Sequence, residues 1–255
     1  MSTATIEPIP FTRLLSIELR KMFDTRSGFW LMASIVILSV LASVATLIFE
    51  DPAHLVYEDF ATAIGVPMSI ILPVVGVLSV TSEWSQRTAL TTFTLVPSRG
   101  RVIAAKFVNV VLIGIVSMVV AIVVGALANL VGSAIAGIDP VWDSSLREMG
   151  QIALAGVAGM LVGFTLGVVV RSSAAAIVAY FVFKFVLPGI SGALASVQQW
   201  WFDHSAWFDL NSAMFQLYDQ HLSGTEWAQF GVTSIIWVVV PLAVGLRLLL
   251  RAEVK

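Results

Sequence analysis

The sequence of 255 residues contains no cysteine. This absence excludes disulfide bonds, thiolate metal ligands and a cysteine nucleophile. Charged residues are also scarce, at 12% of the chain, whereas hydrophobic residues make up 58%. A soluble domain of this length cannot bury so much apolar surface in its core. The composition therefore indicates a membrane protein.

Motifs for catalysis and metal binding are missing as well. No segment fits the pattern G-x-x-x-x-G-K-[ST], so we expect no ATP hydrolysis by a phosphate-binding loop of this chain. The apolar stretches lack the series of Asp, Glu or His that a proton relay or an intramembrane hydrolase needs. His204 beside Asp203, or His221 near Asp219, could contribute to a metal site, but neither pair has the spacing of a metal-ligand motif. We predict no catalytic residues and no metal, and favour surface solvation for these histidines.

Six apolar stretches are long enough to cross the hydrocarbon layer of a bilayer, which takes about 20 residues in a helix. They occupy residues 29–49, 61–81, 107–135, 149–170, 174–194 and 227–249. The sequence therefore predicts an all-α polytopic membrane protein with a single six-helix transmembrane domain at 29–249. We expect Pro67 and Pro73 to bend the second span, and Pro188 to interrupt the fifth.

Positions 11–26 predict an amphipathic helix before the first span. Its apolar face holds Phe11, Leu14, Leu15, Leu19, Met22 and Phe23, and its basic residues, largely off that face, are Arg13, Arg20, Lys21 and Arg26. We expect this helix to lie in the membrane interface, with its basic side chains at the lipid head groups. Packing against a soluble partner is the less favoured alternative, because a span follows within three residues.

The segment 195–226 combines aromatic and acidic residues before the last span. The aromatic side chains include Trp200, Trp201, Phe202, Trp207, Phe208, Phe215 and Tyr218, and the acidic ones between them are Asp203, Asp209 and Asp219. Amphipathic aromatic sequences of this kind are typical of the boundary between lipid and water. We predict short helices here that dip into the outer face or lie on it.

Charges are distributed unevenly between the two sides that six spans define. Twelve of the 14 Lys and Arg residues fall on the side of the termini, and eleven of the 16 Asp and Glu residues fall on the other side. Arg147 lies opposite the termini, and Lys184 lies within the fifth span. By the positive-inside rule both termini, with the tails at 1–28 and 250–255, are expected in the cytoplasm.

Small residues recur along the fourth span. Gly159, Gly163 and Gly167 are spaced four residues apart, and Ala155 lies one turn earlier. Small residues in this register allow two helix backbones to approach closely. Packing within one subunit is the favoured interpretation, ahead of an interface between subunits.

Lys184 is the one ionisable side chain well inside a predicted span. A lysine at the centre of a membrane helix costs roughly 2.5–3.5 kcal/mol to insert, so some compensation is expected. Either the helix breaks at Pro188 and lets Lys184 reach the outer surface, which is slightly favoured, or Lys184 faces a wet cavity. Our hypothesis is that Lys184 lines a translocation route near its outer gate.

Spans two and five offer an apolar lining for such a route. The candidate pathway residues are Met68, Ile71, Leu72, Val75, Tyr180, Phe181, Lys184 and Phe185. They would suit hydrophobic or amphipathic molecules, although lipid contact or core packing explains the same residues equally well. The substrate stays open, since drugs, peptides, lipids and glycans are all compatible with this lining.

A polar and basic segment, 82–106, separates the second and third spans. Its first half predicts a short surface helix over residues 83–95. The residues that lie near one another at helical spacing are Trp84, Arg87, Leu90 and Thr91. Pro97 and the turn composition that follows it are expected to end this helix. Since both ends are anchored in spans, we predict a tethered loop at the cytoplasmic surface.

This segment resembles the cytoplasmic loop of type-2 ABC transporter permeases, the ABC-2 class. The matching residues are Glu83-Trp84-Ser85-Gln86-Arg87-Thr88, Leu90, Val96-Pro97-Ser98-Arg99 and Ala105-Lys106. Arg87 stands where the family pattern usually has glycine. An amphipathic first helix, six spans and a re-entrant element between spans five and six extend the resemblance over the whole chain.

The resemblance implies the membrane-spanning permease subunit of an ATP-driven exporter in the bacterial plasma membrane. Two permease subunits, identical or different, would form the translocation pathway and join two separate ATP-binding subunits. ATP and Mg would bind to the partner ATPase, and no cofactor to this chain. The helix at 11–26 would brace the contact with the ATPase. The residues implied in ATPase coupling are Glu83, Trp84, Arg87, Thr88, Leu90, Thr91, Pro97 and Arg99.

Two other classes of function fit part of the sequence. A secondary transporter or channel needs ion-coupling carboxylates or a polar pore, and the spans offer only Lys184, Asn109, Asn129 and scattered Ser and Thr. A non-transporting membrane anchor or signalling partner of an ATPase would use the same loop. Nucleic acid is not an expected partner.

Overall fold

The computed structural model describes residues 10–24, 26–85, 99–218 and 221–251. Regular structure in these residues is helical, apart from one isolated bridge between Val56 and Val141. The helices, in chain order, are α1 (Phe11–Asp24), α2 (Arg26–Phe49), α3 (Tyr57–Ser85), α5 (Arg99–Ala136), α6 (Leu146–Val170), α7 (Ser173–Phe181), η1 (Val182–Val186), α8 (Leu187–Val197), α9 (Gln199–His204), η2 (Ser205–Trp207), α10 (Leu210–Gln216), α11 (Gly224–Ser234), η3 (Ile235–Val239) and α12 (Val240–Arg251).

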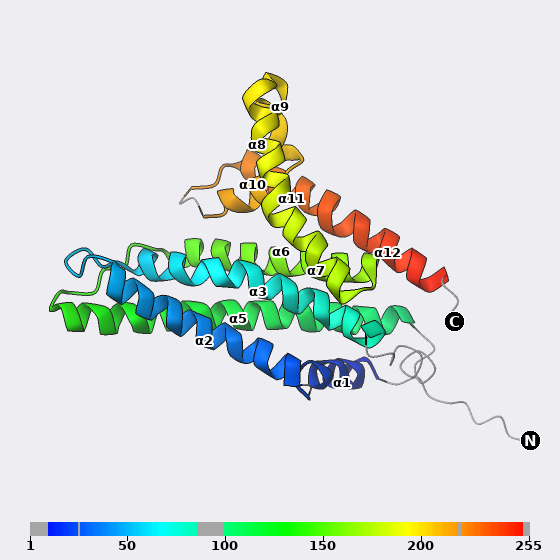
Figure 1. Ribbon diagram of the computed structural model, residues 1–255, viewed down its shortest axis with the longest axis horizontal. Helices are drawn as coiled ribbons and strands as arrows, with labels where there is room; N and C mark the ends of the chain where they lie inside the picture. The colour runs from blue at the N-terminus through cyan, green and yellow to red at the C-terminus, as the bar shows by residue number, and fades with distance from the viewer. Residues whose placement is uncertain (1–9, 25, 86–98, 219–220, 252–255) are drawn as a thin grey trace, which may run out of the picture.

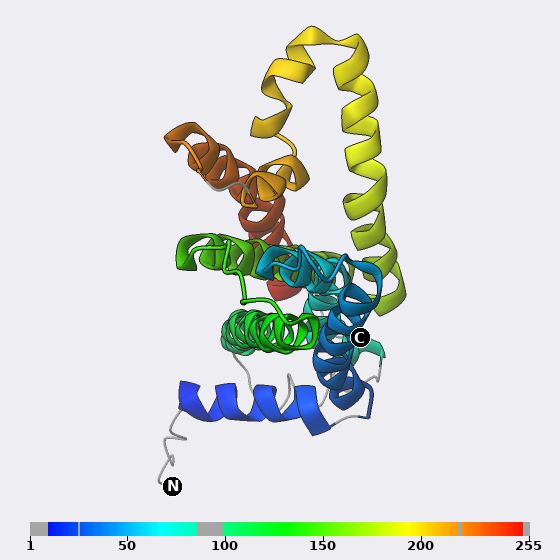
Figure 2. The same cartoon turned by 90° about the vertical axis from the view of Figure 1, so that its left-hand side faces the viewer.

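Four long helices, α2, α3, α5 and α6, run side by side and form the body of the molecule (Figure 1). The short helix α1 lies across one end of this body. The continuous helix formed by α7, η1 and α8 leaves the body at a steep angle, and Figure 2 shows that α9 and α10 complete an arch from its far end. In α8 and α9 no residue is buried.

Six helices in the described part of the chain are long and apolar enough to cross a membrane. They are Gly28–Phe49, Tyr57–Glu83, Gly100–Ala136, Leu146–Val170, Ser173–Val197 and Gly224–Arg251. The all-α polytopic fold predicted from the sequence is therefore confirmed. The helices α6 and α11 begin before the apolar stretches that they contain, because polar residues can form the first turn of a helix. Ser145 with Glu148, and Ser223 with Glu226, build capping boxes that satisfy free N–H groups at the starts of α6 and α11.

Glycines bring α3 and α6 into close contact at the centre of the body. A Cβ atom added to Gly163 would lie 2.1 Å from the carbonyl oxygen of Pro73, and one added to Gly76 would lie 2.3 Å from that of Met160. At these two positions any larger residue would collide with the backbone of the neighbouring helix. The expectation that the glycines of the fourth span serve packing within one chain is confirmed.

The fifth and sixth spans each contain a π-helical segment. In η1 the N–H of Leu187 donates to the carbonyl oxygen of Val182, and in η3 the N–H of Val240 donates to that of Ile235. Each segment is followed at the same offset by a proline, Pro188 or Pro241. The break predicted at Pro188 is wrong, since the helix widens instead and continues to Val197. A wide turn just before a proline accommodates a residue that has no N–H to donate and that would crowd the carbonyl four residues earlier.

Short helices between the fifth and sixth spans, predicted from the aromatic sequence, are present as α9, η2 and α10. Trp201 Nε1 donates to the carbonyl oxygen of Ser191 over 3.1 Å, which fastens α9 back onto α8. Trp237 Nε1 donates to the carbonyl oxygen of Phe208 over 2.7 Å, and the ring of Trp237 lies edge-on to Phe183 with centroids 5.1 Å apart. The segment before α10 is thereby tied to both π-helical segments.

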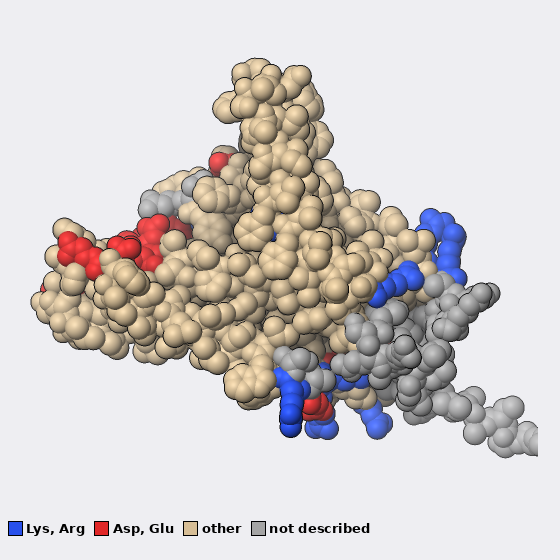
Figure 3. Space-filling view, in the orientation of Figure 1, with Lys and Arg blue, Asp and Glu red and all other residues tan. Residues whose placement is uncertain are grey.

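Charges separate along the molecule as they do along the sequence. On the face seen in Figure 3, Lys and Arg gather toward the end where both termini lie, and Asp and Glu gather at the opposite end. The side chains between the two ends on this face are almost all uncharged. Such a distribution is typical of a protein whose middle section lies in hydrocarbon.

Candidate functional site

Four charged side chains meet where α1 crosses the ends of α3 and α5. Lys106 Nζ lies 2.6 Å from Glu18 Oε2 and 3.3 Å from Glu83 Oε1. Lys21 Nζ lies 2.7 Å from Glu18 Oε1 and 3.0 Å from Glu83 Oε1. We call Glu18, Lys21, Glu83 and Lys106 the charge cluster. Its two carboxylates and two ammonium groups give it no net charge.

Three members of the charge cluster are buried. The exposed fractions are 3% for Glu18, 5% for Glu83 and 4% for Lys106. Burial costs several kcal/mol for each ion and is offset only where the partners and hydrogen bonds are well placed. Here each ammonium contacts both carboxylates, so removal of one member leaves an unbalanced charge among the others. A buried cluster of this kind fixes the relative positions of the helices that carry it.

Burial and pairing oppose each other in setting the pKa values of the cluster's α1 residues. Burial raises the pKa of the Glu18 carboxyl, but the ammonium groups of Lys106 and Lys21 outweigh it and hold the pKa below its usual range. Burial lowers the pKa of Lys21, but its hydrogen bond to Glu18 and the charge of Glu83 raise that pKa above the usual value. Both residues are therefore held in their charged forms.

Two further hydrogen bonds fasten this junction. Lys106 Nζ donates to the backbone carbonyl of Ser79 over 3.0 Å, joining α5 to α3. Asn109 Nδ2 donates to the carbonyl of Leu15 over 2.9 Å, joining α5 to α1. The three helices are thus connected on both sides of the segment 86–98, which links α3 to α5.

Sequence reasoning did not find the role of Glu18. Leu14, Glu18 and Met22 follow one another at four-residue spacing, so Glu18 lies on the apolar face of α1. A carboxylate on an apolar face requires a buried cation, and this was the signal available in the sequence. Of the basic residues predicted for the interface, Arg13 and Arg20 are exposed on α1 and Arg26 is the exposed first residue of α2, whereas Lys21 belongs to the charge cluster.

Only part of the predicted ATPase-coupling set lies within the described residues. Glu83 is a member of the charge cluster, as stated above. Trp84 belongs to the last turn of α3 and Arg99 begins α5, but the side chains of both lie outside what the structure describes. The remaining predicted residues, Arg87, Thr88, Leu90, Thr91 and Pro97, lie outside the described residues.

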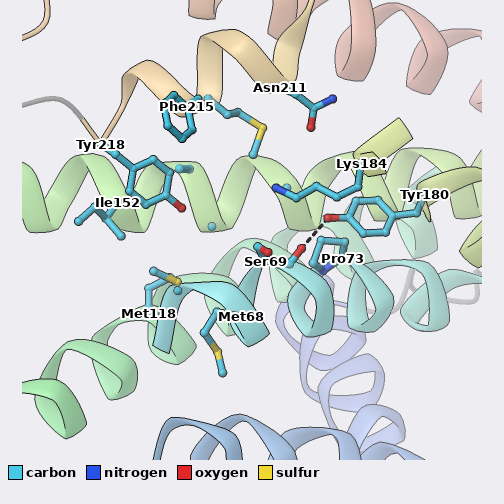
Figure 4. A pocket seen from close by; sticks show the side chains of 15 residues that line it. Met68, Ser69, Pro73, Met118, Ile152, Tyr180, Lys184, Asn211, Phe215 and Tyr218 are labelled. Atoms are coloured by element: carbon cyan, nitrogen blue, oxygen red, sulfur yellow. Dashed lines mark hydrogen bonds between the residues drawn. The ribbon is translucent and has the colours of Figure 1, made fainter. Parts of the chain in front are cut away.

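A cavity of about 70 Å³ lies among α3, α6, η1 and α10, with α5 at its side. About 10–15 Å³ of such space holds one water molecule, so the cavity has room for several. Its polar lining is Ser69, Tyr180, Lys184, Asn211 and Tyr218. Its apolar lining includes Met68, Pro73, Met118, Ile152, Met214 and Phe215. Figure 4 shows the Lys184 ammonium group directed into the space between Tyr180 and Tyr218.

The π-helical segment η1 accounts for the position of Lys184. In the π pattern, Pro188 would donate to the carbonyl of Phe183, but proline has no N–H. Asn211 Nδ2 donates to that carbonyl instead, over 2.9 Å. Tyr180 O–H donates to the carbonyl of Ser69 over 2.6 Å. These two bonds hold the continuous helix of α7 and η1 against α3 and α10, with Lys184 on the cavity side.

The eight candidate pathway residues fall into three groups in the structure. Met68, Tyr180 and Lys184 line the cavity. Leu72 and Val75 are buried in the core of the body, and Ile71 packs partly buried against them. Phe181 stacks on Phe185 with ring centroids 6.0 Å apart, and Phe185 is 57% exposed. The structure therefore brings only three of the eight residues together around the cavity.

The described histidines have simple surroundings. His54 Nε2 lies 4.0 Å from Asp51 Oδ2 at the surface, and His204 Nδ1 lies 2.8 Å from the carbonyl of Trp200. Among the residues that the structure describes, no three His, Asp or Glu side chains gather as metal ligands would.

Comparison with known protein families gives one match that covers most of the chain. Residues 21–254 match the family described as ABC-2 family transporter protein. The matched range contains all six spans from end to end, the cavity and three members of the charge cluster, Lys21, Glu83 and Lys106. No match is found among curated proteins.

Proposed function

Because the chain belongs to the ABC-2 family of transporter proteins, we propose that it is the permease subunit of an ATP-driven exporter, coupled to ATP-binding subunits on separate chains. Membership of this family makes the chain a multi-pass membrane component of an ABC transporter, a class whose membrane component is not itself catalytic. The proposal adds the direction of transport, the coupling to ATP hydrolysis and the composition of the complex.

The charge cluster is the observation that carries the coupling proposal. The segment 86–98 emerges between Glu83 and Lys106, and both of these residues are ion-paired to α1. A force applied to the segment reaches α3, α5 and α1 together because buried ion pairs hold the three helices at this point. The junction can thus act as the rigid end of a lever that converts closure of an ATPase into a choice between two membrane arrangements.

The predicted coupling residues are proposed for this lever. Arg87, Thr88, Leu90 and Thr91 would contact the ATPase, Glu83 and Trp84 would carry the movement into α3, and Pro97 and Arg99 would carry it into α5. In this arrangement α1, with Arg13 and Arg20 exposed to lipid head groups, supports the junction from the membrane interface.

The remaining parts of the proposal concern the assembly and its orientation. We place both termini in the cytoplasm, because Lys and Arg gather toward the end of the molecule at which Figure 1 marks the termini (Figure 3). The plasma membrane of a bacterial cell is proposed from the family resemblance. Two permease subunits enclose the translocation pathway and each binds one ATP-binding subunit. ATP and Mg bind on the partner ATPase, and this chain binds no cofactor.

Co-purification tests the proposal directly. The chain is expressed with an ABC ATP-binding subunit from the same organism, and the complex is reconstituted in lipid. We expect both proteins to purify together with vanadate-sensitive ATP hydrolysis that exceeds the hydrolysis of the ATPase alone. Arg87→Glu should abolish this increase without lowering membrane insertion, whereas Arg147→Gln, on the opposite side, should retain it. A lack of association, or an unchanged increase in the Arg87→Glu variant, would contradict the proposal.

A further inference from the structure

We propose that the cavity beside η1 binds the negatively charged group of an amphipathic molecule, and that the Lys184 ammonium group holds it. This inference rests on the proposed function, since it names the substrate class for the same transport pathway. It depends on three observations: an intramembrane cation with no carboxylate partner among the described residues, neutral polar groups around it, and an apolar extension of the cavity.

The first observation is the contrast between two lysines within the spans. Lys106 contacts two carboxylates and a backbone carbonyl. Lys184 lies within the helix 173–197, and among the described residues no carboxylate lies within 4.0 Å of its Nζ. Cations inside membrane helices normally pair with an anion or face a pathway. Lys184 faces the cavity, so an anion that enters the cavity would supply the missing partner.

The second observation is the chemistry of the groups near Lys184. Tyr180, Tyr218, Asn211 and Ser69 are all neutral and line the same cavity. Figure 4 shows the lysine side chain extended between the two tyrosines. A cationic ligand would be repelled by Lys184, and no carboxylate in the described lining of the cavity would offset that repulsion. A wholly apolar ligand would displace water from the ammonium group and leave it unpaired. Of these three ligand chemistries, the lining favours an anionic group.

The third observation is a second, smaller cavity of about 20 Å³ that continues from the first. The two share Gly65, Met68, Met118 and Ile152 in their linings, and the second is otherwise lined by apolar side chains and Tyr57. Along α3 the combined lining runs from Pro73 to Tyr57, which is about 24 Å at 1.5 Å per residue. Methionines in both linings can adapt to chains of different shape. The side chains beyond the charged group are therefore mostly apolar, which suits the apolar part of an amphipathic molecule.

The cavity is also accessible from the side of α10. Phe215 and Tyr218 belong to its lining, yet Phe215 is 74% exposed and Tyr218 is 46% exposed. These two residues join the described lining of the cavity to the surface, and their ring centroids lie 6.3 Å apart. An amphipathic molecule could thus enter without displacing the packed core between α3 and α6.

Direct binding to the permease chain tests this inference. The purified chain in phosphatidylcholine nanodiscs is titrated with radiolabelled hexadecyl sulfonate, with empty nanodiscs as the background. Hexadecanol and hexadecyltrimethylammonium serve as neutral and cationic competitors of the same chain length. We expect the sulfonate to bind at least tenfold more tightly than either competitor. Equal binding of the alcohol and the sulfonate by the wild-type chain would overturn the inference without any variant.

Two substitutions of Lys184 locate the anion. Lys184→Gln should remove the preference for the sulfonate, and Lys184→Arg should keep it. Arg147→Gln is the matched control, because it removes one positive charge from an exposed residue outside the cavity and should bind like the wild type. Unchanged sulfonate binding in Lys184→Gln would overturn the assignment to this residue.

The source of the anion is settled by changing the bilayer. Phosphatidylglycerol repels the sulfonate from the bilayer surface in every variant, so the comparison with Lys184→Gln is the readout. If anionic phospholipids occupy the cavity, phosphatidylglycerol nanodiscs should weaken sulfonate binding more in the wild type than in Lys184→Gln. If the ligand is a free amphiphile, the change of bilayer should affect both equally. Both results agree with an anionic group in the cavity, and they differ in whether that group comes from a phospholipid or from a free amphiphile. The binding assay uses no ATPase, so its failure is distinguishable from failure of the exporter proposal, which the co-purification tests.

Discussion

Replacement of Lys106 by methionine is the sharpest test of the charge cluster. The substitution keeps much of the side-chain volume but removes an ammonium group that is 2.6 Å from Glu18 and 3.3 Å from Glu83. Two charges about 4 Å apart interact by about 4 kcal/mol at an effective dielectric constant of about 20. Because the substitution leaves two buried carboxylates with only the part-exposed Lys21 as cation, we expect a net loss of about 3–5 kcal/mol of unfolding free energy.

The assay for Lys106→Met is reversible unfolding of the purified chain in mixed micelles, followed by circular dichroism. The double variant Lys106→Met with Glu18→Gln should recover part of the loss, because it removes the carboxylate that the first change leaves without its closest cation. Lys21→Met is the control, and it should cost less because the side chain of Lys21 is 40% exposed. The reasoning is refuted if Lys106→Met costs no more than Lys21→Met, or if the double variant shows no recovery.

Two further predictions concern pH and packing. Because the pKa of Glu18 is lowered in the folded chain, Glu18 contributes stability that is fully present above pH 4.5, its usual pKa, and is lost as the pH falls through its folded-state pKa. Because the pKa of Lys21 is raised, Lys21 contributes stability that is fully present below pH 10.5, its usual pKa, and is lost as the pH rises through its folded-state pKa. Thermal unfolding across pH should therefore show a plateau between these limits, and Glu18→Gln should flatten its acidic side. Gly163→Ala should destabilise the chain by about 1–3 kcal/mol because its Cβ would meet the carbonyl of Pro73, whereas Gly189→Ala has open space and should leave thermal stability nearly unchanged or raise it. A similar loss in both alanine variants would contradict the packing argument.

The fold was predictable from the sequence to the extent that it depends on length and hydropathy. Each span needs about 20 apolar residues, and runs of that length are unambiguous in a chain with so few charges. The packing of Gly163 was predictable for a similar local reason, since glycines at four-residue spacing present a smooth helix surface. The starts of α6 and α11 were predicted three residues too late because capping boxes extend a helix into polar sequence.

The candidate site was less predictable because it depends on contacts between distant segments. Lys106 was assigned only to the start of a span, and its partner Glu18 lies on α1, 88 positions earlier in the chain. A charge on an apolar helix face shows that a partner is needed but does not identify that partner. Lys184 was correctly singled out as unusual, yet its surroundings depend on Asn211, which reaches η1 from a different helix.

The two π-helical segments have a practical consequence for mapping the chain in a bilayer. Each segment accommodates one residue more than an α-helical turn, so positions beyond Val186 and Val239 are rotated by about 100° from where an uninterrupted helical wheel would draw them. Because the native chain has no cysteine, single cysteines can be introduced and labelled one at a time without a prior background substitution. The helical pattern of label accessibility along the fifth and sixth spans should shift by one residue after each π-helical segment. A model of which residues face the lipid must include that shift.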